Sequence, residues 1–281
     1  KYFPFLSNWT LRVIFTMKYN GTLLKMETLL ENPVEYELPI GDELVYMNHL
    51  IGKYIVFKWE KEIYCIGCGR KTNKSFAQGF CYPCLISAPE TSECILRPQL
   101  CEAHKGIARD MDWAKNHCLQ THFVYLAISS GVKVGVTRSE QIPTRWMDQG
   151  AWQAIKLAKT PNRYTAGLIE VELKQHISDR TQWQRMLKNQ LIEGVDLKCK
   201  KKEMLNCLSN ELQKYECNDN EIVEIIYPVN KYPEKVKSLS FDKLDEIAGL
   251  LWGIKGQYLI FDDGTVLNIR KHTGYLISLE V

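Results

Sequence analysis

The stretch "YCIGCGRKTNKSFAQGFCYPC", residues 64–84, carries two pairs of cysteines, Cys65-x2-Cys68 and Cys81-x2-Cys84, with twelve residues between the pairs. The short spacing within each pair lets two thiolates approach one ion at about 2.3 Å, and two such pairs fill the tetrahedral shell of Zn²⁺. A redox dithiol and an iron–sulfur cluster are the alternatives, but two Cys-x2-Cys pairs together are more typical of zinc sites. The stretch therefore predicts a structural zinc ion that is required for folding of the first half of the chain.

A second group of cysteines and histidines follows within residues 94–122. Seven of the ten cysteines fall between Cys65 and Cys118, interleaved with histidines, and this mixture favours metal binding over a secreted disulfide scaffold. The alternative is that some of these residues are core thiols and surface histidines. The second tetrahedral site is predicted to use Cys94, Cys101, His104 and Cys118. His122 is the first substitute if one of these is not a ligand.

The composition is that of a folded protein with more than one core. The chain has 281 residues, of which 45% are hydrophobic and 25% charged, and its net charge of +3 does not by itself indicate a nucleic-acid-binding protein. No apolar run approaches the roughly 20 residues that span a bilayer, so we expect no membrane-spanning role. Residues 1–16 are expected to be an upstream extension before a start at Met17, because no small-residue cleavage site follows an apolar core; a weak signal peptide is the alternative. With the extension, the chain is expected to be cytoplasmic.

The pattern along the chain predicts an α+β fold in several units. Residues 17–64 contain short blocks of β-branched and aromatic residues and predict a small β unit, and residues 65–122 form the metal-binding region. Strands alternate with helices over residues 123–197. Residues 198–281 predict a helix followed by a second small β unit, in which Asp263-Gly264 marks a hairpin turn. The two β units could pack together.

Local signals place strands and helices within the third unit. "HFVYLAI" and "VKVGVT" predict two strands joined in a hairpin by the turn residues 129–131. Apolar residues recur at helical spacing after Thr160 and Pro161, and this predicts a helix over residues 160–177 with Thr160 as its N-cap. A second helix is expected within residues 180–194.

Residues 123–189 resemble the GIY-YIG nuclease superfamily. "FVY", at positions 123–125, stands where the first tripeptide of that family lies, and "KVG", at positions 133–135, stands at the second. Arg145 follows ten residues after the glycine, as the family's arginine does, and Glu170 on the next helix takes the place of the metal-binding glutamate. The complete chain also resembles a prokaryotic zinc-knuckle protein family without an assigned activity.

The resemblance implies four catalytic residues. Glu170 would hold Mg²⁺ or Mn²⁺ against the scissile phosphate, Tyr125 would help to activate water, and Arg145 would stabilise charge on the phosphate. Lys133 stands where the family has its second tyrosine. It would orient phosphate or, if desolvated, assist proton transfer.

Basic residues cluster around this unit, with tryptophans between them that could stack on unpaired bases. Solvated charges and core tryptophans are the plainer interpretation. The expected nucleic-acid-binding residues are Arg138, Lys156, Lys159 and Arg163. The sequence thus favours a zinc-containing protein that binds DNA or RNA and, as an enzyme, cleaves it with Mg²⁺ or Mn²⁺. The alternative is a non-catalytic module that docks on RNA or on a protein partner.

Overall fold

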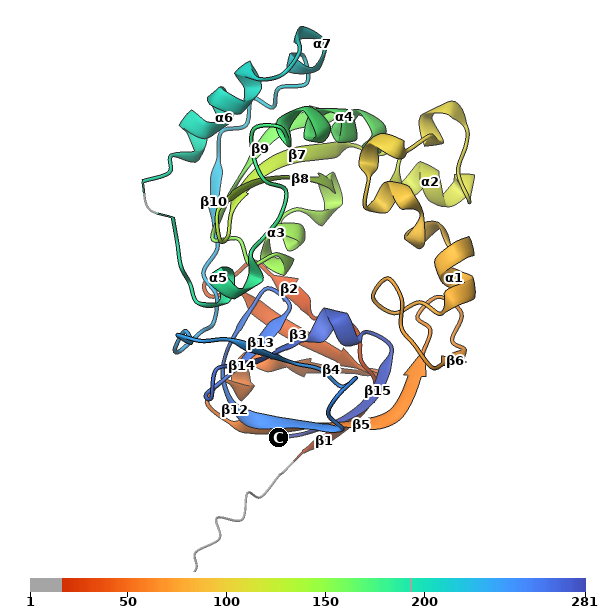
Figure 1. The fold of residues 1–281 in the computed structure, drawn as a ribbon, viewed down its shortest axis with the longest axis vertical. Coiled ribbons are helices and arrows are strands. Elements are labelled where there is room, and N and C mark those ends of the chain that lie inside the picture. Colours follow the sequence, from red (N-terminus) through yellow and green to blue (C-terminus); the bar gives the residue numbers. More distant parts are fainter. Residues whose placement is uncertain (1–16, 193) are drawn as a thin grey trace, which may run out of the picture.

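The structure is a computed structural model that describes residues 17–192 and 194–281. The expectation of an upstream extension at residues 1–16 lies outside the described residues. Helices and several β-sheets are both present, so the predicted α+β class is confirmed (Figure 1). Within the described ranges, no helix combines the length and the apolar character that a bilayer crossing needs.

The largest sheet has eight strands and unites the two ends of the chain. Strand β5 (Tyr54–Tyr64) pairs antiparallel with both β12 (Glu246–Lys255) and β15 (Tyr275–Glu280), so the two β units expected separately share one sheet. The turn at Asp263-Gly264 joins β13 (Tyr258–Phe261) to β14 (Thr265–Asn268), as predicted. The remaining strands are β1 (Lys18–Thr22), β6 (Lys71–Thr72) and β11 (Lys237–Leu239).

A three-stranded sheet packs against the large sheet. It contains β2 (Glu27–Leu29), β3 (Glu35–Ile40) and β4 (Glu43–Tyr46), in that order. The 3-10 helix η1 (Met47–Leu50) follows. Buried side chains from both sheets form a continuous hydrophobic core that is closed to water.

The metal-binding region consists of short helical turns, which suit a segment that is held by metal ligands rather than by its own core. Figure 1 shows it in orange and yellow along one side of the molecule, between β5 and helix α4. It contains α1 (Tyr82–Ser87), η2 (Pro89–Thr91), η3 (Glu93–Ile95), η4 (Pro98–Leu100), η5 (Ala103–Lys105) and α2 (Met111–His117).

A four-stranded antiparallel sheet forms the remaining unit. Its order is β10 (Ile222–Glu224), β9 (Gln153–Thr160), β7 (His122–Ile128) and β8 (Val132–Arg138), and the predicted β7–β8 hairpin is confirmed.

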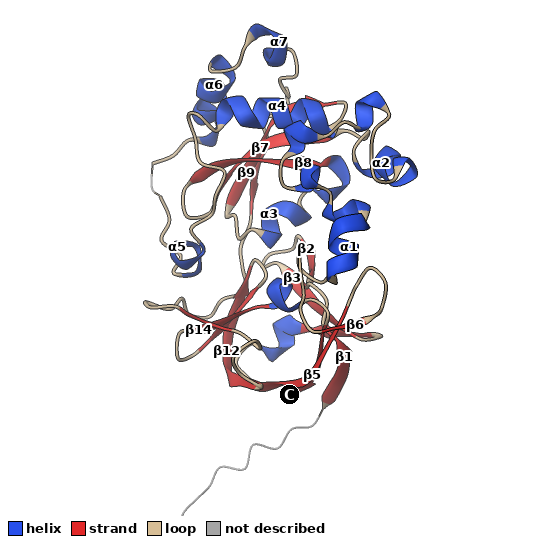
Figure 2. Cartoon of the chain, turned by 45° about the vertical axis from the view of Figure 1, so that its right-hand side comes forward, coloured by secondary structure: helices blue, strands red, loops and turns tan. Residues whose placement is uncertain are grey.

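Helices cover both faces of this sheet (Figure 2). After η6 (Ser139–Gln141), α3 (Thr144–Asp148) lies on the face toward the large sheet, and α4 (Arg163–Leu173) covers the opposite face.

The predicted start of helix α4 was wrong by two residues, and the helix ends at Leu173 rather than at Ile177. Thr160 is the last residue of β9 and pairs with His122, so its hydroxyl donates to the His122 carbonyl at 3.2 Å. Asn162 is the N-cap, and its side chain accepts a hydrogen bond from the N–H of Thr165 at 2.9 Å. Both residue types favour N-caps, and only the strand pairing decides between them.

The helix expected within residues 180–194 is reduced to α5 (Trp183–Leu187). Two helices, α6 (Leu197–Asn206) and α7 (Asn210–Gln213), follow it. Side chains of α6 contribute to the core on the α4 side of the four-stranded sheet.

Candidate metal centres and active-site cavity

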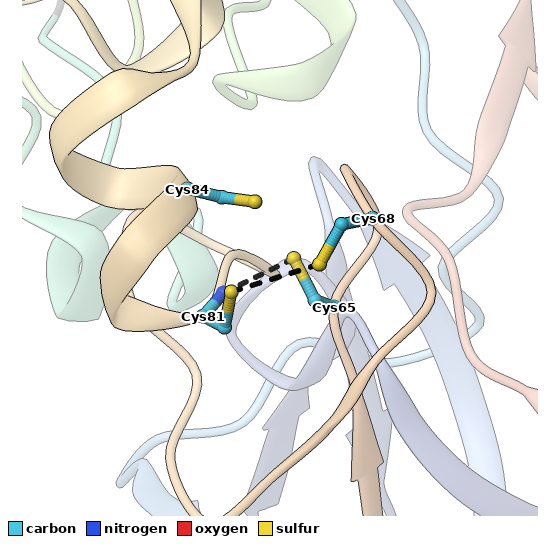
Figure 3. Close-up of side chains that lie close together, drawn as sticks. All are labelled: Cys65, Cys68, Cys81 and Cys84. Atoms are coloured by element: carbon cyan, nitrogen blue, oxygen red, sulfur yellow. Dashed lines mark hydrogen bonds between the residues drawn. The ribbon is translucent and has the colours of Figure 1, made fainter.

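Four cysteines come together at the end of β5 (Figure 3). The Sγ atoms of Cys65, Cys68, Cys81 and Cys84 all lie within 4.8 Å of one another. The Sγ atoms of Cys68 and Cys81 are 3.8 Å apart. This equals the edge of a tetrahedron of sulfurs with zinc bonds of about 2.3 Å, which is roughly 3.8 Å. The group is therefore geometrically suited to structural zinc.

Local backbone geometry aims these thiols at one point. Cys65 directly follows β5, and Cys81 is the N-cap of α1, so Cys84 lies in the first turn of that helix. The N–H of Cys81 donates to the Cys65 Sγ at 3.2 Å. Burial acts to raise the pKa of Cys65, but backbone N–H groups of Cys81 and Cys68 outweigh it and lower that pKa to about 6. Cys65 thus favours the thiolate, which is the form that binds zinc.

A second group contains three of the four predicted ligands. The Sγ atoms of Cys94, Cys101 and Cys118 lie within 4.8 Å of one another, and this group too is suited to zinc. Neither His104 nor His122 belongs to it. The ring of His104 stacks on the ring of Tyr164 with centroids 4.3 Å apart. His104 as the fourth ligand stays a prediction.

Three of the four expected catalytic residues line one cavity of about 170 Å³. Tyr125 comes from β7, Arg145 from α3 and Glu170 from α4. Lys174 and Asp179, which the sequence analysis did not single out, also line the cavity. Lys174 lies one helical turn after Glu170 and was detectable by that spacing, whereas Asp179 lies beyond the helix.

Glu170 shares a cation with Asp179. The Lys174 Nζ lies 3.2 Å from the Glu170 Oε2 and 3.1 Å from the Asp179 Oδ2. Burial raises the pKa of Glu170, and the Lys174 ammonium opposes that rise. The Glu170 Oε2 is buried, and the Lys174 ammonium is its partner. A buried carboxylate oxygen of this kind, beside a second carboxylate, fits the donors that Mg²⁺ and Mn²⁺ take.

Tyr125 lies over a glycine on the neighbouring strand. Tyr125 pairs with Gly135, and a Cβ at Gly135 would lie 2.5 Å from the Tyr125 hydroxyl oxygen. Any larger residue at position 135 would therefore displace the Tyr125 side chain. The Tyr125 hydroxyl donates to the Gln149 Oε1 at 3.1 Å. Burial raises the pKa of Tyr125, so the hydroxyl is a hydrogen-bond donor at neutral pH.

Lys133 lies behind the cavity wall. Its side chain is buried, and its Nζ donates to the Gln149 Oε1 and, at 2.7 Å, to the Thr181 Oγ1. Gln149 lines the cavity, so one hydrogen bond separates Lys133 from it. Burial, and then the charge of Arg145, lowers the pKa of Lys133 to about 7. Lys133 can therefore exchange a proton near neutral pH.

The model of one protein family, described as "protein of unknown function (DUF2797)", matches residues 52–277. The chain belongs to the DUF2797 family. The matched residues include both cysteine groups and every residue that lines the 170 Å³ cavity. No curated protein and no solved structure matches the chain.

In this DUF2797 chain, Arg163 connects α4 to the metal-binding region. Its side chain is buried, and its guanidinium donates to the carbonyl oxygens of Cys94 at 3.3 Å and His117 at 3.2 Å. Arg163 was predicted to contact nucleic acid. Its observed contacts give it a positioning role next to the second cysteine group.

The other three predicted nucleic-acid-binding residues differ in whether they form ion pairs. Arg138 pairs with Glu140 at 2.8 Å, and Lys156 pairs with Asp219 at 2.8 Å. Lys159 is exposed. Contact of these residues with nucleic acid stays a prediction.

Lys133 makes the stability of this DUF2797 chain depend on pH. Its folded pKa of about 7 lies below its ordinary value of 10.5, so between these values the unfolded chain holds one more proton. The free energy of unfolding contributed by Lys133 is lowest below pH 7 and rises above it, by at most about 1.4 kcal/mol per pH unit. In denaturant unfolding, the free energy of unfolding of Lys133→Met should therefore exceed that of wild type by the largest amount at pH 6 and by the smallest at pH 9. A difference that is constant with pH would contradict this.

Proposed function

We propose that this chain is a zinc-containing nucleic-acid-binding protein in which residues 123–189 form a GIY-YIG-like nuclease domain. The observation that carries the proposal is the shared cavity of Tyr125, Arg145 and Glu170, which come from three different elements. A hydroxyl, a guanidinium and a carboxylate are the groups that phosphodiester hydrolysis needs around one phosphate. The antiparallel order β9-β7-β8, with a helix after the hairpin, supports the same proposal.

Each side chain has a role that its surroundings support. Glu170, with Asp179 beside it, would hold Mg²⁺ or Mn²⁺, and the bound cation would polarise the phosphate. Arg145 would stabilise the developing negative charge. Tyr125 stays protonated because its pKa is raised, and it would donate to a phosphate oxygen by exchanging its present hydrogen bond to Gln149. Lys133 would fix the orientation of the Gln149 amide, which lines the cavity, through its hydrogen bond to the Gln149 Oε1.

The second cysteine group supports this cavity structurally. Ile95, Leu96 and Pro98, from the segment between Cys94 and Cys101, line it, and this segment packs against α4. A zinc ion on these thiolates would fix that segment against the cavity without entering the chemistry.

One observation favours the non-catalytic alternative. The Glu170 carboxylate is paired with Lys174, and the Tyr125 hydroxyl is already bonded to Gln149. A site whose polar groups satisfy one another in this way also fits a module that binds RNA or a protein without cleaving it. The two candidates differ in one measurable property, which is cleavage that depends on a divalent cation.

Glu170→Gln is expected to lower the cleavage rate by about 100-fold, because the amide keeps the shape of the side chain but loses the charge that holds the cation. Labelled DNA and RNA oligonucleotides are incubated with Mg²⁺ or Mn²⁺ and the products separated on a gel. Glu172→Gln is the matched control on the same helix. The Glu172 carboxylate binds the N–H of Ser209 at 2.9 Å and its hydroxyl at 3.0 Å, away from the cavity.

Full activity of Glu170→Gln would contradict the assignment of Glu170. If the wild-type protein binds the oligonucleotides but cuts none of them with either cation, the nuclease proposal is contradicted. The non-catalytic docking module is then the function that remains.

A further inference from the structure

A second cavity, of about 670 Å³, adjoins the proposed active site and is built from separate units of the chain. It shares Arg145 and Gln149 with the 170 Å³ cavity. The 3-10 helix η7 (Ile269–His272) and the residue after it contribute Arg270 and Thr273. The first cysteine region contributes Ile66. Three parts of the chain that are far apart in sequence thus enclose the space beside Arg145.

Two arginines without carboxylate partners face this space. Within residues 17–192 and 194–281, neither Arg145 nor Arg270 has an ion pair with an acidic side chain. Asp148, the acidic residue that acts on Arg270, is paired with Lys25 at 2.9 Å. Burial, and then the charge of Arg145, lowers the pKa of Arg270. Two guanidiniums held together against their repulsion favour an anion between them, and phosphate suits their fork of donors.

One wall of the cavity is apolar and open to contact, whereas Lys25 and several polar side chains line the remainder. Leu96 is 85% exposed and Ile66 is 43% exposed, and both line it together with Phe80 and Leu85. Among the described residues that line the cavity, one is acidic: Glu90, whose side chain is exposed. An apolar wall beside two guanidiniums matches a nucleotide, which presents a flat base and a phosphate, better than an inorganic anion or an acidic peptide.

The size of the cavity favours a single-stranded over a double-stranded ligand. A sphere of 670 Å³ is about 11 Å across. The major groove alone of B-form DNA is about 12 Å wide, so a duplex does not enter, whereas one or two unpaired nucleotides do. Arg145 and Arg270 also line a third cavity of about 330 Å³, so a strand can continue past them.

We infer that Arg270, together with Arg145, binds the backbone phosphate of a single-stranded nucleic acid next to the phosphate in the active site, and that the 670 Å³ cavity takes the adjoining nucleotide. This inference rests on the proposed function and adds its substrate class, which is unpaired DNA or RNA. It also gives the C-terminal β strands a role, because η7 between β14 and β15 carries Arg270.

Fluorescence polarisation of the full chain tests the inference with a short labelled oligonucleotide, as single-stranded DNA, as single-stranded RNA and as a blunt duplex of the same sequence. Mg²⁺ and Mn²⁺ are omitted so that no cleavage occurs, and no chelator is added because it would remove zinc. At least one single strand is expected to bind about tenfold or more tightly than the duplex. Arg270→Gln is expected to weaken that binding about tenfold, the usual effect of losing one charge-assisted hydrogen bond.

Two variants control for folding and for net charge. Arg270→Lys keeps the charge and should retain part of the affinity. Arg185→Gln removes the same charge from an exposed position on α5 and should change the affinity less than twofold. Equal losses in Arg270→Gln and Arg185→Gln, or a duplex that binds as tightly as both single strands, would overturn the inference.

The binding experiment separates this inference from the nuclease proposal. Single-strand binding that requires Arg270, in a protein that cuts nothing, leaves the inference standing and removes the nuclease. Metal-dependent cleavage that is unchanged in Arg270→Gln leaves the nuclease proposal standing and removes the inference.

Discussion

Cys68→Ala is expected to reduce the zinc content from two ions to one per chain and to unfold the segment that follows β5. The Cys68 side chain is exposed, so its removal takes little from the hydrophobic packing. The loss acts through the metal, because three thiolates cannot close the tetrahedral shell. Structural zinc contributes about 10–16 kcal/mol in small zinc-finger peptides, and α1 with its neighbouring turns has few other stabilising contacts.

Metal analysis of the purified protein measures the zinc content, and hydrogen exchange measures protection of residues 65–88. Cys199→Ala is the matched control, because Cys199 is also an exposed thiol, on α6, outside both cysteine groups. It should keep both zinc ions and full protection. A Cys68→Ala protein with two zinc ions and unchanged protection would refute the first zinc site.

Gly167→Ala is expected to destabilise the chain by about 3 kcal/mol and to displace the wall of the active-site cavity. An alanine Cβ at this position on α4 would lie 2.2 Å from the Gln99 nitrogen and 2.4 Å from the Pro98 carbonyl carbon. Both are backbone atoms, so a side-chain rotation cannot relieve the clash. The segment that carries Ile95 and Leu96 must therefore move away from α4.

The direction of the stability change in Gly167→Ala separates tertiary packing from helix propensity. Helix propensity alone favours alanine over glycine by about 1 kcal/mol, so a helix without this contact would be stabilised by the change. Denaturant unfolding compares Gly167→Ala with Gly131→Ala, whose Cβ would meet the Ile192 Cδ1 at an ordinary 3.6 Å. Stabilisation of Gly167→Ala would show that α4 and the metal-binding region do not pack as described.

Short-range patterns were sufficient for several parts of this molecule. The spacing of Cys65, Cys68, Cys81 and Cys84 is itself a geometric constraint, because each pair meets one ion within a single turn. The β7–β8 hairpin followed from alternation around a turn, and the turn at Asp263-Gly264 followed in the same way. Within each cysteine pair and each hairpin the interacting residues are close in sequence, so local geometry fixes these parts.

Other features depend on contacts between distant residues. The three-cysteine group joins turns up to 24 positions apart, from Cys94 to Cys118, and leaves His104 stacked on Tyr164. The pKa of Lys133 falls because burial and Arg145 act on it together, and neither is visible in a strand pattern.

The sequence by itself determined the α+β class, the first four-cysteine group and the residue types around a candidate phosphate site. Tertiary structure alone decided that the strands from the two ends of the chain share one sheet and that Arg270 lies beside Arg145. The physical reason is the range of the forces involved. A metal knuckle or a hairpin is fixed by a few adjacent torsions, whereas strand order and the meeting of Arg145 with Arg270 depend on how whole units bury their apolar faces against one another.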